Sequence, residues 1–220
     1  MNKDFNKIEK FDYILNSLAN YKNPLILELG VNKGGSTKIF LDFISSNNGK
    51  LFSIDINDCS NAVQNKRWKF LKSNDLNSNF IIEKFADIKN EGIDLLFIDS
   101  YHDPTHVKLL LNKWAQYVNK DGVIILDDTE SLHYKLRKKF THSVINDAID
   151  QVVKEFYYQN NKHFIYTKYF MGAGLSKLEK KTPKNEKLTN SKVWKYNSLF
   201  SMTYLYLKKI IFFLRNYNKY

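Results

Sequence analysis

Three carboxylates and a histidine follow two apolar runs in the middle of the sequence. The run "LLFID" ends at Asp99, with His102 three residues later, and "VIILDD" ends with Asp127 and Asp128. Neighbouring parallel strands lie about 5 Å apart, so carboxylates at the ends of two such strands can converge on one point. Convergent oxygen ligands suit a hard divalent cation such as Mg²⁺. The sequence therefore predicts a magnesium site at Asp99, Asp127 and Asp128.

A glycine-bearing turn, "ELGVNKGGS", follows an earlier apolar run. It lacks the second glycine of G-x-G-x-x-G and the Gly-Lys-Ser/Thr of a phosphate loop. Its actual spacing is E-x-G-x-x-x-G-x-S, set by Glu28, Gly30, Gly34 and Ser36. Gly30 can let a flat cofactor lie against the backbone, and the N-terminus of the following helix, with Ser36, can hold a carboxylate. The alternative is a plain strand-turn-helix connection with convenient glycines.

These residues need a scaffold that brings several strand ends together. Short apolar runs at residues 24–29, 50–55, 68–72, 93–99, 122–128 and 163–168 are typical of strands. Helix-like segments lie between them; one begins with an Asp103 cap and Pro104 at its first position. The alternation predicts a parallel, doubly wound α/β sheet, in which ligands bind beyond the carboxyl ends of the strands.

The combination resembles class I methyltransferases that use S-adenosylmethionine, and most closely the metal-dependent O-methyltransferases of the catechol and macrocin (sugar-modifying) types. It rests on the glycine turn, on Asp55 at the end of the next strand about 25 residues after Gly30, and on the acids that follow the later strands. The resemblance covers roughly residues 24–175. It implies a Rossmann-like, mostly parallel seven-stranded sheet with helices on both faces.

The resemblance also implies roles for individual residues. Asp55 would accept hydrogen bonds from the ribose hydroxyls, and Ser73 or Asn74 would contact the adenine. His102 would be the general base. Asp99 would take part in catalysis, contact the cofactor and bind the metal ion. The cofactor set as a whole is Glu28, Gly30, Asn32, Gly34, Ser36, Asp55, Ser73, Asn74 and Asp99.

Methyl transfer from a sulfonium needs an activated nucleophile. A cation would orient two substrate oxygens and lower a hydroxyl pKa, and His102 could accept the proton. Methyltransferases that act on amino groups of bases commonly carry Asn/Asp-Pro-Pro-Tyr/Phe after the fourth strand, whereas this chain has "DSYH". Oxygen is therefore the expected acceptor atom. The other histidines, His106, His133, His142 and His163, have no partner at a recognisable spacing, and we expect them to be structural or exposed.

Composition limits the cellular context. The 220 residues contain one cysteine, Cys59, which allows no intrachain disulfide or thiolate metal cluster and favours a reducing compartment. The N-terminal segment carries charges throughout and does not resemble a secretory signal, so we expect a cytoplasmic protein. Residues 176–220 hold ten Lys and one Arg against two Glu, a balance of +9, which leaves +2 of the total +11 for residues 1–175. This distribution disfavours a nucleic-acid enzyme.

The C-terminal part divides into two predicted segments. Residues 176–192 are lysine-rich and poor in apolar residues, which indicates a solvated linker after a domain at 1–175. Residues 193–220 are basic, aromatic and nearly all apolar, and we expect a helix there. It could dock on the domain, form a homodimer contact, or lie on an anionic membrane at the inner membrane face. Nucleic-acid binding is disfavoured by the near-neutral domain.

The sequence thus predicts an S-adenosylmethionine-dependent, Mg²⁺-assisted O-methyltransferase that acts on a hydroxyl of a sugar, surface glycan or related small molecule. Two alternatives stay open. In the first, the Asp pair only caps a loop and the methyltransferase needs no metal. In the second, the protein binds the cofactor without catalysis and serves as a membrane scaffold.

Overall fold

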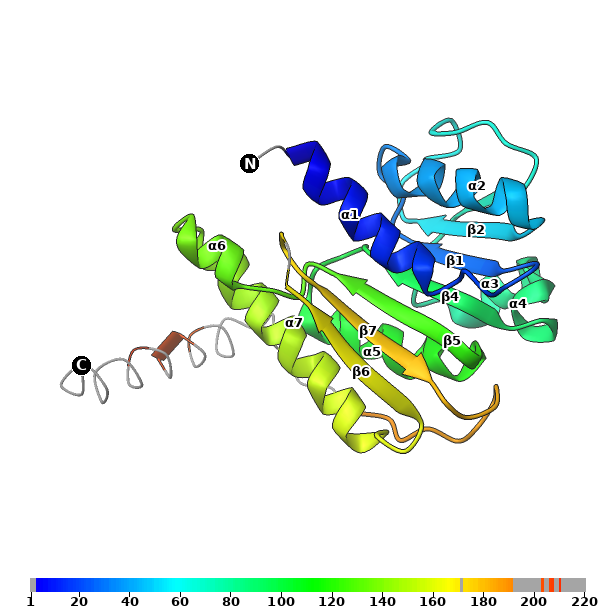
Figure 1. Cartoon of the computed structure of the whole chain (residues 1–220). Coiled ribbons are helices and arrows are strands. Elements are labelled where there is room, and N and C mark those ends of the chain that lie inside the picture. The colour runs from blue at the N-terminus through cyan, green and yellow to red at the C-terminus, as the bar shows by residue number, and fades with distance from the viewer. Residues whose placement is uncertain (1–2, 171, 192–202, 204–205, 208–209, 211–220) are drawn as a thin grey trace.

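The computed structural model describes residues 3–170, 172–191, 203, 206–207 and 210, with side chains described from residue 9 onward. One seven-stranded sheet forms the centre of the molecule, in the order β3-β2-β1-β4-β5-β7-β6 (Figure 1). The strands are β1 (Leu25–Leu29), β2 (Lys50–Asp55), β3 (Trp68–Lys72), β4 (Ile93–Ile98), β5 (Val118–Asp127), β6 (Phe164–Tyr169) and β7 (Leu175–Lys180). β7 is antiparallel to both β5 and β6, and the other pairs are parallel. The predicted mostly parallel seven-stranded sheet is confirmed.

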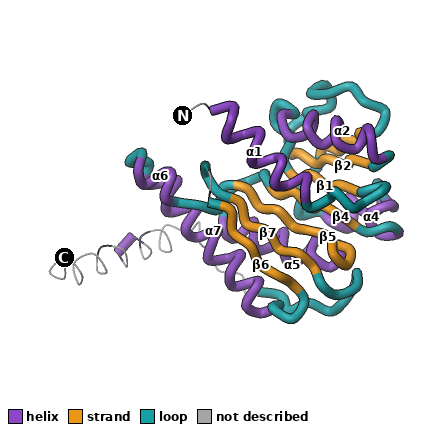
Figure 2. The backbone as a smooth tube through the Cα atoms, viewed as in Figure 1, coloured by secondary structure: helices purple, strands orange, loops and turns teal. Residues whose placement is uncertain are grey.

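Helices cover both faces of this sheet (Figure 2). One face packs against α1 (Lys3–Asn16) and α2 (Gly35–Asn47), through residues such as Phe11 and Phe40. The opposite face packs against α3 (Ser78–Lys84), α4 (Ala86–Asn90), α5 (Pro104–Trp114) and α7 (Phe140–Gln159). A short 3₁₀ turn, Ala115–Tyr117, follows α5, and the short helix α6 (Leu132–Leu136) precedes α7. The fold is therefore a doubly wound α/β sandwich.

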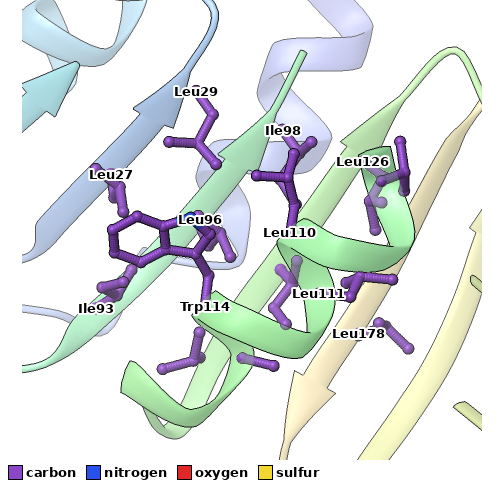
Figure 3. Close-up of a cluster of buried hydrophobic side chains, with 14 of the residues drawn as sticks. Leu27, Leu29, Ile93, Leu96, Ile98, Leu110, Leu111, Trp114, Leu126 and Leu178 are labelled. Atoms are coloured by element: carbon purple, nitrogen blue, oxygen red, sulfur yellow. The ribbon is translucent and has the colours of Figure 1, made fainter. Parts of the chain in front are cut away.

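The packing of α5 shows how the sequence pattern produces this layer. Asp103 caps the helix by accepting a hydrogen bond from the His106 N–H at 2.9 Å, and Pro104 follows at the first position. Leu110, Leu111 and Trp114 then face the sheet, where Figure 3 shows them against side chains of β1, β4, β5 and β7. Each such buried apolar side chain contributes about 1.5–3 kcal/mol. The helix is thereby fixed with its first turn at the carboxyl ends of the strands.

The segment predicted as a linker, residues 176–192, is instead part of the domain over its described residues, 176–191. Residues 175–180 form β7, which lies between β5 and β6. The chain beyond it stays on the domain, because the Thr189 N–H donates to Asn160 and the Ser191 N–H donates to Asn112. The predicted domain boundary at residue 175 is therefore wrong, and the domain continues to at least Ser191.

The predicted helix at 193–220 lies mostly outside the described residues. Of that segment, only Thr203, Tyr206, Leu207 and Ile210 are described, and all four have helical backbone. Within the described part of the chain, none of the helices has both the length and the apolar character needed to cross a bilayer.

Candidate active site

A cavity of about 590 Å³ opens at the carboxyl ends of the parallel strands. It is formed by the turns that follow β1, β2, β3 and β4, so it gathers residues that are far apart in the sequence. Eight of the twelve predicted site residues line it: Gly30, Asn32, Ser36, Asp55, Ser73, Asn74, Asp99 and His102. The other four described residues of the predicted set, Glu28, Gly34, Asp127 and Asp128, lie outside its lining.

Gly30 is required by the approach of β1 to the end of β4. Its φ is +97°, and a Cβ at this position would lie 2.2 Å from the Asp99 carbonyl oxygen. The Gly30 N–H donates to the Ile54 carbonyl, and the Asp99 N–H donates to the Leu29 carbonyl, both at 2.9 Å. Gly30 therefore allows the ends of β1, β2 and β4 to meet at the cavity. This packing excludes any side chain at position 30, whereas the sequence analysis expected the glycine only for contact with the cofactor.

Gly34 acts one step further along the turn. It caps the N-terminus of α2 in the left-handed conformation, with φ +72° and ψ +27°, and its N–H donates to the Val31 carbonyl at 2.9 Å. No side chain caps this helix. Ser36, in the first turn of α2, lines the cavity, and the positive end of the helix dipole lies at the same point. This end of the cavity can hold a carboxylate.

Glu28 is buried beneath the turn rather than in the cavity. Its side chain is fully buried and accepts three hydroxyl hydrogen bonds, from Ser36 at 2.5 Å, from Ser53 at 2.6 Å and from Thr37 at 2.8 Å. Burial raises the pKa of the Glu28 carboxyl, while the three hydroxyl donors lower it. Glu28 thus joins α2 to β2, and the predicted cofactor contact through this residue is not what the structure describes.

Asp55 holds the backbone of the glycine turn from the end of β2. Its carboxylate accepts from the N–H groups of Val31 at 2.9 Å, Asn32 at 3.1 Å and Asn57 at 2.9 Å. Burial opposes ionisation of Asp55, but these backbone donors and the Cys59 thiol outweigh it and lower the carboxyl pKa. Asp55 is therefore an anion that faces the cavity with acceptor capacity left for a diol.

The cavity also holds a pair that the sequence analysis missed. His106 Nε2 lies 2.9 Å from Asp75 Oδ1, and both residues line the cavity beside Ser73 and Asn74. Trp114 fixes the Asp75 backbone by donating from its indole N–H to the Asp75 carbonyl at 2.9 Å. His106 therefore has a partner, Asp75, that the spacing of the sequence did not reveal. A signal was present, since His106 lies in the first turn of a helix that begins at the carboxyl edge of the sheet.

His102 lies between two of the predicted carboxylates. His102 Nε2 is 3.6 Å from Asp99 Oδ1 and 3.6 Å from Asp128 Oδ2. Burial, followed by the nearby Asp127, raises the pKa of Asp99 to about 8 and also raises the pKa of Asp128. These raised pKa values favour the neutral carboxyl groups, whereas a positive charge on the imidazole 3.6 Å away would favour the ionised carboxylates, which would stabilise it in return.

Asp127 has a different partner. It is buried, and Lys10 of α1 forms an ion pair with its carboxylate. Among the residues that the structure describes, no group of three or more His, Cys, Asp or Glu side chains has a spacing that would hold a metal ion. The chemistry of the three acids fits a hard divalent cation, because their proximity disfavours three negative charges. For all three acids to bind a cation, the ion pair between Lys10 and Asp127 would have to break.

Comparison with known proteins agrees with this geometry. Residues 27–129 match the model of a methyltransferase domain family. The fold is similar to the MycE methyltransferase of the mycinamycin biosynthetic pathway, solved with Mg, SAH and mycinamycin VI, at 16% identity and a TM-score of 0.58. The match covers 84% of this chain and 51% of that chain, so the present chain spans about half the length of the MycE protein.

Two further solved structures are similar over most of their own length. A putative caffeoyl-CoA O-methyltransferase from Staphylococcus aureus has 14% identity and a TM-score of 0.59, with 81% of this chain and 90% of that chain covered. CalS11, a TDP-rhamnose 3'-O-methyltransferase of calicheamicin biosynthesis, has 11% identity and a TM-score of 0.57, with 81% of each chain covered. No curated protein sequence matches the chain. Residues 27–129, somewhat less than half of the chain, match the methyltransferase domain model, and the solved structures, at 11–16% identity, show that the chain shares the fold of these methyltransferases.

Proposed function

We propose that the protein transfers a methyl group from S-adenosylmethionine to a hydroxyl of a sugar, a surface glycan or a related small molecule. The observation that carries this proposal is that one cavity is lined by Asp55, by the glycine turn and by Asp99 with His102. A cofactor bound along the strand ends would thus extend toward a histidine that lies between two acids.

The cavity offers a partner for each part of the cofactor. Asp55 would accept hydrogen bonds from the ribose hydroxyls, and the N-terminus of α2 would hold the carboxylate of the methionine part. Ser73, Asn74 and the Asp75–His106 pair would surround the base. S-adenosylmethionine supplies a methyl group on a positively charged sulfur, and the chain's own residues orient it.

The acceptor would be activated at His102. A hydroxyl beside His102 Nε2 can pass its proton to the ring as it attacks, and Asp99 and Asp128 would stabilise the imidazolium that forms. Tyr134 of α6 interacts with Asp128 and lowers the pKa of that carboxyl. These contacts favour an oxygen nucleophile, because an alcohol must lose a proton when it is methylated.

We also propose assistance by Mg²⁺, held by Asp99, Asp127 and Asp128. When bound, the cation would orient the acceptor oxygens and lower the pKa of a hydroxyl. The Lys10–Asp127 pair is a specific observation in favour of the alternative, in which a lysine already supplies positive charge and no metal is needed. Turnover in excess EDTA separates the two: loss of activity supports the metal, and full activity removes it.

A sugar acceptor is supported by two of the structural comparisons. The CalS11 protein is described as a TDP-rhamnose methyltransferase, and the MycE protein was solved with mycinamycin VI. Nucleotide-linked sugars and free monosaccharides are therefore the first acceptors to test, with a catechol as the competing class. Transfer of a radiolabelled methyl group to a catechol alone would contradict the sugar proposal.

The first experiment is calorimetric titration with S-adenosylhomocysteine, with and without Mg²⁺. We expect binding that Asp55→Ala abolishes, whereas the exposed Asp58→Ala serves as a matched control and leaves it intact. His102→Ala should keep cofactor binding and lose turnover, with His163→Ala as its control. Wild-type protein that does not bind S-adenosylhomocysteine would contradict the proposed function, and binding without turnover on any acceptor would favour the non-catalytic alternative.

A further inference from the structure

An exposed surface of apolar and basic side chains lies on α6 and the start of α7. Leu132, Leu136 and Phe140 expose 56%, 77% and 67% of their surface. We call these residues, together with Lys135, Arg137, Lys138 and Lys139, the α6–α7 surface. All four basic residues are exposed, and residues 133–142 contain no acidic residue. Large apolar side chains with this degree of exposure mark an interaction site when they occur together.

Described residues of the C-terminal segment extend this surface. Thr203 and Tyr206 line a groove of about 300 Å³ with Phe140, Thr141 and Val144. Tyr206, Leu207 and Ile210 are themselves exposed apolar residues. The described residues Tyr206, Leu207 and Ile210 therefore add exposed apolar side chains to those of the α6–α7 surface.

The α6–α7 surface lies at the catalytic end of the molecule. Figure 1 shows α6 beyond the end of the sheet toward which β5 runs. Tyr134 of α6 interacts with Asp128, one of the acids beside His102, and so connects this surface to them. Phe170, which follows β6, is also exposed and lies at the same edge of the sheet, because Tyr169 pairs with Leu175 and Leu175 with Asp127.

We infer that the α6–α7 surface docks on an anionic lipid bilayer. Leu132, Leu136 and Phe140 would enter the boundary between headgroups and acyl chains, and the neighbouring cations would lie among the lipid phosphates. Charge complementarity selects this partner, since a short apolar stretch gives weak membrane binding unless basic residues add to it. A nucleic acid would use the cations but would leave the exposed Leu136 and Phe140 in water. The inference concerns binding alone and goes beyond the proposed methyl transfer.

The consequence for the reaction is geometric. A bilayer on the α6–α7 surface would face the same end of the sheet as His102 and the cavity that it lines. An acceptor hydroxyl carried on a membrane-attached molecule would then reach the site without the protein leaving the membrane.

The test is flotation of the full chain with vesicles. We expect binding to phosphatidylcholine vesicles that contain phosphatidylglycerol, and little binding to phosphatidylcholine alone. Each basic residue at an anionic surface contributes about fivefold to partitioning, so Arg137→Gln with Lys138→Gln and Lys139→Gln should weaken it roughly a hundredfold. The matched control removes three exposed lysines elsewhere, Lys38→Gln, Lys66→Gln and Lys120→Gln, and should change partitioning by less than about threefold.

The apolar part needs its own variant. Leu136→Ser with Phe140→Ser keeps every charge and should weaken binding by about tenfold or more. Thermal unfolding of each variant verifies that it is folded, and binding of S-adenosylhomocysteine gives a second check that does not involve the membrane.

Three results would overturn the inference. Wild-type binding that is equal on neutral and anionic vesicles removes the role of the cations. Binding that both surface variants retain assigns any membrane contact to another segment, such as 193–220. Absence of vesicle binding, together with a dimer in sedimentation that Leu136→Ser and Phe140→Ser dissociate, shows that the surface is a contact between two copies of the chain.

Discussion

The buried Glu28 carboxylate gives the sharpest test of how the cofactor turn is held. Glu28→Ala removes the acceptor of three hydroxyl groups at 2.5–2.8 Å, from Ser36, Thr37 and Ser53. Each such bond contributes about 1–1.5 kcal/mol net, and the variant leaves buried hydroxyls without this acceptor, so we expect a loss of about 3–5 kcal/mol. That is a large part of the stability of a typical domain, which is about 5–15 kcal/mol.

Glu28→Gln is the informative comparison because it changes charge and little else. The amide nitrogen can donate to the Ser36 hydroxyl, and the amide oxygen can keep the bonds from Thr37 and Ser53. We therefore expect a loss of about 1 kcal/mol or less at neutral pH. Because Glu28 lies beneath the turn rather than in the cavity, Glu28→Gln should also bind S-adenosylhomocysteine with an affinity within about threefold of wild type.

The comparison has a pH dependence with a definite sign. Burial raises the pKa of Glu28 above its ordinary value of 4.5, so the unfolded chain ionises before the folded protein does. The contribution of Glu28 to stability is therefore largest below about pH 4.5 and decreases as the pH rises toward the folded pKa. Glu28→Gln lacks this change, so wild type should lose stability relative to Glu28→Gln as the pH rises toward neutrality.

Urea unfolding of wild type and both variants at several pH values measures these differences, and calorimetry measures cofactor binding on the same samples. The reasoning is refuted if Glu28→Ala unfolds at the wild-type urea midpoint but no longer binds S-adenosylhomocysteine. In that case Glu28 would be the cofactor ligand that the sequence analysis predicted, and its hydroxyl bonds would contribute little.

Three further predictions concern residues around the same sheet. Gly30→Ala should lose about 3 kcal/mol or more of folding stability and all cofactor binding, because its Cβ would lie 2.2 Å from a carbonyl oxygen. Its control is Gly172→Ala, which is also at positive φ but has nothing within 4 Å; it should lose about 1 kcal/mol of folding stability and bind the cofactor normally. Lys180→Met leaves three carbonyls without their amine donor and should lose about 1 kcal/mol or more in urea unfolding. Burial lowers the Lys180 pKa to about 8 from 10.5, so between these pH values Lys180 is protonated only in the unfolded chain. The free energy of unfolding of wild type should therefore rise relative to that of Lys180→Met as the pH increases from 8 to 10.5. Lys10→Met frees the Asp127 carboxylate and should tighten Mg²⁺ binding by roughly fivefold in calorimetry; unchanged affinity would show that the lysine and the cation do not compete.

The sequence was sufficient to predict those residues of the candidate site that lie at the carboxyl ends of strands. β1, β4 and the last half of β5 are mostly apolar and buried on both faces, so the positions of Asp99 and Asp127 at their carboxyl ends follow directly. The direction of a side chain at a strand end was less predictable. Glu28 and Gly30 are two residues apart, yet only Gly30 lines the cavity.

β7 could not be predicted from local pattern. Its two leucines, Leu175 and Leu178, are three residues apart and therefore face opposite sides of the sheet, where each joins a different buried cluster. Lys180, at the end of the strand, is buried as well, with its ammonium donating to carbonyls at 115, 116 and 118. Such a strand has neither alternation nor an apolar run, and only its partners β5 and β6 specify it.

The place of β7 between β5 and β6 determines when the sheet can close during synthesis on the ribosome. β6 emerges before β7, yet β5 and β6 each pair with β7 and not with each other. Until residues 175–180 have emerged, β5 is therefore an open edge, and an open edge is a template for pairing with other chains. At that stage every residue that lines the cavity has already been made, since the last of them is His106. The nascent chain thus contains every residue that lines the cavity before β5 gains its partner strand, and a pause in translation between these points would leave the β5 edge open to pairing with other chains.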